Sequence, residues 1–348
     1  MNTELKDTVP RSSTIVHRLA VLTVVLTWPL IWVGGLVTTY DAGMAVPDWP
    51  NTYGYNLFLY PYKTWLLGPF DLFIEHGHRL LGALVGFTAI GLVISAAMTE
   101  ERRWVKILSA IILLLVIIQG GLGGIRVMLS DRVFAMIHGS TAPIVFAIAT
   151  AGAVVTSRWW KQLSVANHVA VAPDNQAPHN HENANSGMAI PSAGTITVIS
   201  VLLIVCFTQL VLGAKIRHLQ PTDSPSWFLY TVWAHVITAF LIWLLTAVVW
   251  RQLRGSSDFS VSRPGIILVA LTAVQILLGI VSWVVNYGWP SFLQWFPGAS
   301  GHLIESKNYV DALLVTAHVA IGPLILAVST VALLRILRVR YLSRHSFQ

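Results

Sequence analysis

The sequence predicts an all-α fold, a polytopic membrane protein whose eight transmembrane helices form two pseudo-symmetric four-helix bundles. Three observations predict it. Hydrophobic residues make up 55% of the 348-residue chain and charged residues only 11%, whereas a soluble domain carries about 25% charged residues. Eight apolar runs each have the length that crosses a bilayer, about 20 residues. A histidine pattern that recurs four times links these runs in pairs.

The eight runs are expected at 19–39, 72–98, 104–125, 133–156, 193–214, 228–250, 264–286 and 309–335. No small-residue cleavage site follows the first run, so we interpret it as a retained helix rather than a removed signal peptide. The stretch 161–191 is rich in Asn, Ala and Pro and has no helical period, which is typical of a flexible linker. It separates an N-terminal half, residues 1–160, from a C-terminal half, residues 192–348.

Lysine and arginine predict the orientation. With a cytoplasmic N-terminus, and leaving out Arg79 inside a run, 15 of these residues fall on the inside and six on the outside. This satisfies the positive-inside rule and predicts a multi-pass protein of the cell (inner) membrane with both termini cytoplasmic. The basic residues behind the net charge of +7 lie in short loops between apolar runs. This distribution indicates membrane topology rather than a surface that binds nucleic acid.

An internal repeat runs through both halves. In three odd-numbered runs a glutamine stands four residues before a glycine, and Ile31 and Gly35 occupy the same place in the first run. Each even-numbered run carries near its start a histidine that is followed four residues later by Gly or Ala. The glutamine–glycine pairs are Gln119–Gly123, Gln209–Gly213 and Gln275–Gly279, and the histidine–small pairs are His78–Gly82, His138–Ala142, His235–Ala239 and His318–Gly322.

These histidines are candidate haem ligands. All even-numbered runs cross from outside to inside, so the four side chains should lie toward the outer face. Imidazole is a common axial ligand of haem iron, and a small residue one turn along the same helix face leaves room for a flat porphyrin. His78 with His138 would make one bis-histidine site, and His235 with His318 a second.

The two halves differ in one carboxylate. Glu75 stands three residues before His78, on the same helix face, whereas the other three repeats have Ala or Val there. We interpret Glu75 as a general acid or base, although it could also form an i,i+4 pair with Arg79. Arg79, Arg126 and Arg217 are candidates for binding haem propionates or for a structural role. His76 lies off the His78 face and is not expected to be a ligand.

Together these residues resemble the haem A synthase family. The resemblance rests on the E-x-x-H-R element from Glu75 to Arg79, on GGLVTTYDAGMAVPDWP before it, on IHGSTAP around His138, and on the histidines at 235 and 318. It covers essentially the whole chain. The subtype implied lacks the cysteine pair that many relatives carry in the first outer loop, because the single cysteine, Cys206, lies inside an apolar run.

The resemblance implies an oxidoreductase that converts the C8 methyl of haem O to a formyl group by successive hydroxylations, giving haem A for cytochrome oxidase. It implies haem b as cofactor on His235 and His318, and substrate haem O on His78 and His138 with Glu75 as the catalytic residue. Expected partners are an electron donor, haem O synthase and cytochrome oxidase assembly factors. Two alternatives remain: a di-haem b-type electron-transfer protein and a haem delivery protein without catalysis.

Overall fold

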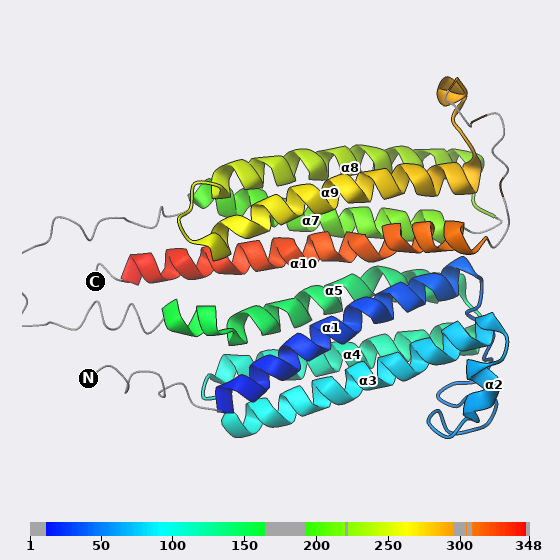
Figure 1. The fold of residues 1–348 in the computed structure, drawn as a ribbon, viewed down its shortest axis with the longest axis horizontal. Coiled ribbons are helices and arrows are strands. Elements are labelled where there is room, and N and C mark those ends of the chain that lie inside the picture. Colours follow the sequence, from blue (N-terminus) through cyan, green and yellow to red (C-terminus); the bar gives the residue numbers. More distant parts are fainter. Residues whose placement is uncertain are drawn as a thin grey trace, which may run out of the picture.

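Long helices that lie side by side make up most of the part of the chain that the structure describes (Figure 1). The computed structural model describes residues 12–163, 192–219, 222–295, 299, 304 and 308–345. Within these residues, eight helices are long and apolar enough to cross a membrane, which confirms the predicted fold class. They are α1 (Ser12–Thr39), α3 (Phe70–Thr99), α4 (Arg103–Leu129), α5 (Arg132–Thr156), α7 (Ala193–Arg217), α8 (Pro225–Leu253), α9 (Phe259–Tyr287) and α10 (Tyr309–His345).

The helices extend beyond the apolar runs because capping residues, rather than hydropathy, decide where they begin. In four helices the side chain of the residue before the first turn accepts a hydrogen bond from a backbone N–H of that turn, which satisfies a donor that has no partner inside the helix. These residues are Asp131, Ser192, Ser224 and Asp258. The shorter α2 (Tyr62–Leu66) and η1 (Ser291–Leu293) lie in the connecting loops. The predicted linker 161–191 begins within a helical segment over 158–163, and its remainder, 164–191, lies outside the described residues.

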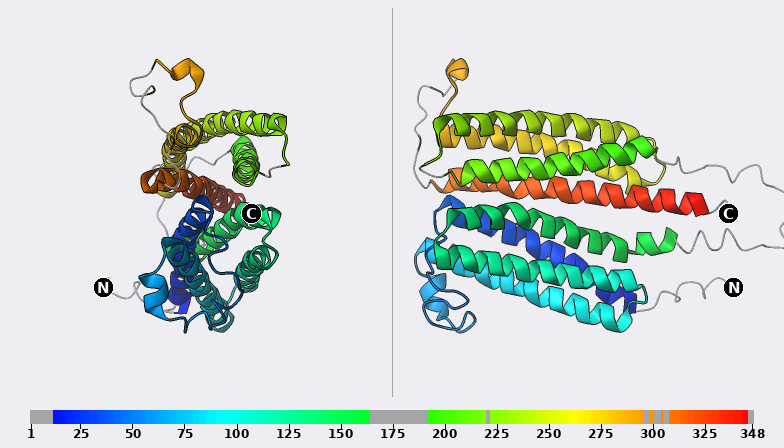
Figure 2. Two further views of the ribbon diagram at one scale, coloured as in Figure 1. Left: turned by 90° about the vertical axis from the view of Figure 1, so that its right-hand side faces the viewer. Right: turned by 180° about the vertical axis from the view of Figure 1, so that it is seen from behind.

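The helices pack as two groups of four. In the first group α1 contacts α3, α3 contacts α4, α4 contacts α5, and α5 returns to α1; α7, α8, α9 and α10 repeat this cycle. Seen end on, the two groups lie one beside the other (Figure 2). Helix α10 contacts α1 and α5, and α7 contacts α5. The Nε1 of Trp28 donates to the carbonyl of Ala320 across this interface at 3.0 Å. The predicted division into halves at 1–160 and 192–348, and their pseudo-symmetry, stay predictions.

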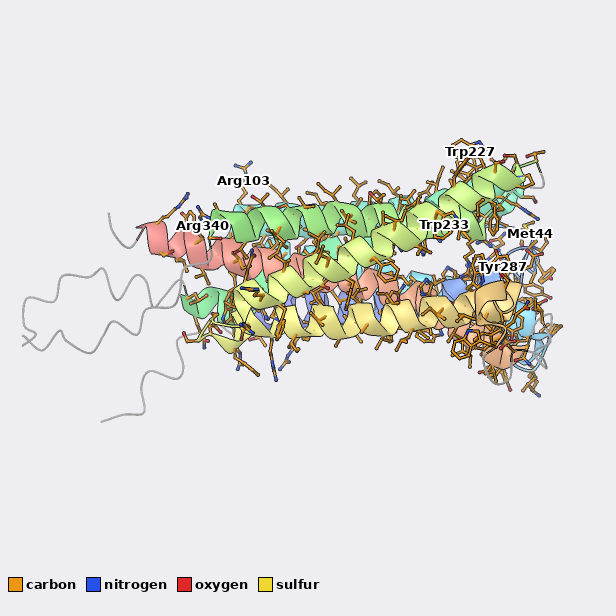
Figure 3. The ribbon with its side chains drawn as sticks, turned by 90° about the horizontal axis from the view of Figure 1, so that it is seen from above. Met44, Arg103, Trp227, Trp233, Tyr287 and Arg340 are labelled. Carbon is orange, nitrogen blue, oxygen red and sulfur yellow. The ribbon has the colours of Figure 1, made fainter. Side chains whose placement is uncertain are left out.

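The two ends of the bundle differ in chemistry. Arg103 and Arg340 lie at one end, and Met44, Trp227 and Tyr287 lie at the other (Figure 3). Helix α1 begins, and α10 ends, at the arginine end (Figure 1). Between the ends, apolar side chains such as Ile117, Ile204 and Leu244 stay more than half exposed. An apolar surface of this extent is what a lipid-facing helix bundle presents.

Candidate functional site

The four repeat histidines come together as two pairs. His78 of α3 and His138 of α5 face each other with ring centroids 6.4 Å apart and ring planes at 87°. His235 of α8 and His318 of α10 do the same at 6.2 Å and 68°. All four rings lie in the first two fifths of helices that start at the end carrying Met44 and Trp227. The pairing within each half is therefore the one that the repeat predicts.

The spacing in both pairs fits one iron between two imidazoles. Two imidazoles that bind one iron from opposite sides have ring centroids about 6 Å apart, because each metal–nitrogen bond is about 2 Å and each nitrogen lies about 1 Å from its ring centroid. In the described part of the chain no group of three or more His, Cys, Asp or Glu side chains gathers around either pair. A metal held here would need further ligands that the described residues do not provide, such as the four nitrogens of a porphyrin.

A glycine on the neighbouring helix fixes the position of each ring. A Cβ added at Gly34 would lie 2.8 Å from Cε1 of His78. The same contact would measure 3.0 Å from Gly279 to His318, 3.1 Å from Gly213 to His235 and 3.4 Å from Gly123 to His138. Each histidine thus packs against bare backbone, which brings the ring closer to the neighbouring helix than any larger residue allows.

Two details of the repeat differ from the sequence interpretation. In α1 the glycine that faces the histidine is Gly34, not Gly35, because Gly35 turns toward Thr316 of α10. The second concerns Gly322, expected to leave room beside His318. A Cβ there would lie 3.0 Å from Leu210 of α7, so this glycine brings α10 close to α7 instead.

Carbonyl groups orient the rings. The Nδ1 of His318 lies 3.1 Å from the carbonyl oxygen of Gln275, a hydrogen bond that assigns the proton to Nδ1 and leaves Nε2 as the nitrogen available to a metal. The Nδ1 atoms of the other three histidines are buried without a hydrogen-bond partner among the described residues. The carbonyls of Leu30, Gln119 and Gln209 face them, outside hydrogen-bond geometry. The rings of the first three repeats are therefore less firmly oriented than that of His318. These ring–carbonyl pairs are His78–Leu30, His138–Gln119 and His235–Gln209.

Glutamine side chains connect the helices in three of the four glycine–histidine pairs. The Nε2 of Gln119 donates to the Oγ1 of Thr141 at 2.6 Å, and the hydroxyl of Thr238 donates to the Oε1 of Gln209. The Nε2 of Gln275 donates to the carbonyl of His318 at 2.8 Å. The sequence showed the glutamine–glycine spacing but gave the glutamines no role. They hold the histidine-bearing helix against the glycine-bearing one.

Glu75 is buried, with 3% of its surface exposed, and is held by an arginine one turn along α3. The Nη2 of Arg79 donates to its Oε1 at 2.8 Å, so the predicted i,i+4 pair is present. The backbone N–H of Val46 donates to Oε2 at 3.3 Å. Oε1 thus has a strong, charged partner, whereas Oε2 has a single long bond and retains capacity to accept a proton.

Arg79 also fastens the first long loop to α3. Its Nη1 donates to the carbonyls of Asp48 at 2.6 Å and Asn51 at 2.9 Å, and its Nη2 donates to the carbonyl of Val46 at 2.7 Å. All the hydrogen bonds of this guanidinium therefore go to Glu75 and to the loop. Of the two roles predicted for Arg79, the structural one accounts for these contacts.

A family comparison covers the part of the chain that contains this site. A sequence model of the cytochrome oxidase assembly protein family COX15-CtaA matches residues 17–230, which is more than half of the chain. The chain belongs to this family. The resemblance to haem A synthases is thereby confirmed at the level of the family. A comparison with curated proteins found no match.

The match encloses the first histidine pair, Glu75 and the three candidate arginines, and it ends before His235. As a COX15-CtaA family protein, the chain is expected to act in cytochrome oxidase assembly and haem A synthesis. Membership of the family does not assign ligand roles to the second pair. The ring spacing of that pair, 6.2 Å, is close to the 6.4 Å of the first pair.

Arg126 and Arg217 of this COX15-CtaA protein are half-buried. The charge of Arg126 lies near the first histidine pair and that of Arg217 near His318 of the second. The Nη2 of Arg126 donates to the carbonyl of Gly43 at 3.1 Å. The Nη2 of Arg217 donates from α7 across to α1, to the carbonyl of Gly35 at 2.6 Å and to the hydroxyl of Thr39 at 2.5 Å. The Nη1 of Arg217 is buried without a partner among the described residues. Arg217 thus bridges the bundles and keeps one donor for a further acceptor.

Two histidines outside the pairs were not assigned a function from the sequence. His76 is buried and its Nδ1 lies 3.1 Å from the hydroxyl of Thr52, with Tyr60 and Trp65 packed on its ring. It anchors the loop to α3, and its absence from the ligand set stays a prediction. His218 follows α7, where burial and then the positive charges of Arg217, Arg126 and Arg132 lower its pKa to about 4. No spacing in the sequence signals either contact.

Proposed function

We propose that this protein is a haem A synthase, which oxidises the C8 methyl of haem O to a formyl group through successive hydroxylations. The observation that carries the proposal is the buried Glu75 beside one histidine pair only. The position equivalent to Glu75 in the second pair's helices is Val232 or Val315. Two sites that only transfer electrons have no use for a carboxylate in one of them. Oxidation of a methyl group to a formyl group takes up one oxygen atom and releases protons together with electrons, and a carboxylate beside the reacting pair can accept those protons while the electron partner takes the electrons.

Each half then has its own role. His78 and His138 would hold the iron of the substrate, haem O, and His235 and His318 would hold haem b as the resident cofactor. When bound, haem b would supply one-electron redox chemistry. The paired imidazoles fit both groups, since both are porphyrins with one iron. The Nδ1 of His318 bonds to the carbonyl of Gln275, a contact that none of the other three rings shares among the described residues, and this firmer orientation suits a permanently bound group in the second half.

Glu75 would act as the base through Oε2, the oxygen with the single long hydrogen bond. The guanidinium of Arg79 holds Oε1 and neutralises the buried charge, which a carboxylate in this environment requires. Arg126 and the free Nη1 of Arg217 would bind propionate carboxylates of the two porphyrins. An electron donor, haem O synthase and cytochrome oxidase assembly factors remain the expected partners.

The experiment replaces Glu75 by glutamine, which keeps the size of the side chain and removes its basicity. We expect Glu75→Gln to retain haem b and to accumulate haem O without forming haem A. Glu101→Gln is the matched control, because Glu101 is exposed at the opposite end of α3 and should leave haem A formation unchanged. If Glu75→Gln made haem A at the normal rate, Glu75 would not be the base.

The equal geometry of the two pairs favours one competitor, a di-haem electron-transfer protein in which both haems are permanent. This alternative predicts haem b in both halves and no haem O or haem A in the purified protein. A haem delivery protein without catalysis would bind haem O but would not alter it. The pigments that co-purify with the chain distinguish all three.

A further inference from the structure

The first long loop exposes apolar side chains at its tip. We define the loop tip as residues 55–59, with the sequence YNLFL, and no charged residue occurs between Pro50 and Tyr62. Within the tip Tyr55 is 52% exposed, Phe58 56% and Leu59 76%. A loop surrounded by water would not usually gather exposed aromatic and aliphatic side chains with no charge among them.

The tip lies beside the membrane-spanning part of α3 rather than over the end of the bundle. The rings of Phe58 and Phe87 are 5.8 Å apart between centroids. Phe87 lies eight residues past Arg79, which corresponds to about 12 Å along a helix. No charged residue follows Arg79 in α3 before Glu100, so the hydrocarbon region begins close to Arg79 and the tip reaches well below its edge.

Figures 1 and 2 agree with this placement: the loop that carries α2 projects to the side of α3. The neighbouring surface of α3 faces lipid, since Leu84 is 45% exposed, Phe87 58% and Ile90 44%. The apolar surface of the tip is therefore continuous with a surface that already contacts acyl chains.

The backbone of the loop is suited to an apolar environment. A backbone N–H in hydrocarbon must find its partner within the protein. The N–H groups of Tyr53 and Gly54 donate to the carboxylate of Asp48. Within the tip, the N–H of Phe58 donates to the Oδ1 of Asn56 at 2.9 Å, and the N–H of Leu59 donates to the carbonyl of Asn56 at 3.0 Å. The most exposed part of the tip thus satisfies its own donors.

We propose that residues 55–59 insert into the acyl chains of the leaflet at the end of the bundle where α3 begins. The hydrogen bonds of Arg79 and the packing of His76 fasten the base of the loop to α3, so the tip is held at this depth by the same residues that surround Glu75. The inference does not depend on the proposed enzymatic function.

The test measures depth with a nitroxide spin label in lipid nanodiscs. Cys206 is the only cysteine and is buried, so Cys206→Ala gives a label-free background. Leu59→Cys is compared with Ile90→Cys on the lipid-facing surface of α3 and with Glu101→Cys in water. Collision rates with oxygen, which dissolves in lipid, and with a polar nickel complex, which does not, are measured at each position.

We expect the oxygen-to-nickel collision ratio at position 59 to match that at position 90 and to exceed that at position 101 on the order of tenfold, because a polar complex is excluded from hydrocarbon. A ratio at position 59 equal to that at position 101 would overturn the proposal. That outcome is the one expected if the tip were instead a docking surface for a second protein. Position 59 is exposed, so its label should not disturb folding, and unchanged haem content of the labelled protein verifies this.

Discussion

The glycine that faces each histidine offers a graded test of the paired-ligand geometry. Ordinary contacts to a Cβ measure 3.4–4 Å, whereas a Cβ at Gly34 would lie 2.8 Å from the His78 ring. The ring in a Gly34→Ala variant must therefore retreat by about 0.6 Å, and metal–ligand distances tolerate only about 0.2 Å. Overpacking of this kind costs about 1–3 kcal/mol, which corresponds to a loss of roughly 5–150-fold in porphyrin affinity.

The other three glycines extend the series. A Cβ at Gly279 would lie 3.0 Å from the ring of His318, and one at Gly213 would lie 3.1 Å from that of His235. These distances are 0.4 Å and 0.3 Å shorter than the 3.4 Å of the closest ordinary contact, whereas the distance at Gly123 is 3.4 Å and requires no movement of the ring. Alanine at Gly34 should therefore weaken binding in the N-terminal half strongly, and alanine at Gly123 hardly at all. Alanine at Gly279 or Gly213 should weaken binding of haem b in the C-terminal half.

The assay is haem content per chain, with chromatography of the extracted pigments, after purification at increasing dilution. Gly121→Ala is the matched control, because a Cβ there meets nothing within 4 Å and alanine favours a helix over glycine by about 1 kcal/mol. Equal haem loss in Gly121→Ala and Gly34→Ala, or full haem retention in Gly34→Ala, would refute the reasoning.

Three further predictions follow from the same contacts. His235→Ala should abolish haem b binding, measured by its absorption spectrum, while Trp233→Ala, which changes an exposed side chain of the same helix, should not. Arg217→Ala should lower the free energy of unfolding by about 1.5–3 kcal/mol, because charged hydrogen bonds are lost, and Arg217→Lys should have an intermediate effect. An unchanged melting temperature in Arg217→Ala would contradict the bridging role of Arg217. The pKa of His218 is about 4 in the folded chain, lowered by burial and then by Arg217, against about 6.5 unfolded. Between pH 4 and pH 6.5 the His218 side chain therefore binds a proton in the unfolded state but not in the folded state, so the free energy of unfolding should fall as the pH drops from 6.5 to 4. His218→Asn should reduce this dependence of the melting temperature on pH.

Much of the fold follows from hydropathy alone. Each of the eight apolar runs lies within one helix. A membrane-spanning segment must satisfy its own backbone hydrogen bonds, and an α-helix does so within a single segment. The ends of the helices depend on local capping instead. Helix α1 starts at Ser12 rather than at 19, and α10 continues to His345 rather than ending at 335, because polar and basic residues extend a helix into the interface without any hydropathy signal.

The histidine pairing was predictable because repeats preserve spacing, and spacing on a helix determines the face. The choice between Gly34 and Gly35 was not, because adjacent glycines differ only in which neighbouring helix they face. The contacts of Arg79 with Val46 and Asn51 also lie beyond sequence reasoning, since a loop can return to a helix in many ways and no periodicity reports which one it takes.

The central claim is that one histidine pair binds a substrate and the other a resident cofactor. Chromatography of the pigments in the purified wild-type protein, produced together with a source of haem O, tests it most directly. If the two pairs have these different roles, the protein should contain one haem b per chain together with haem O or haem A. Two equivalents of haem b per chain, with no haem O or haem A, would contradict it.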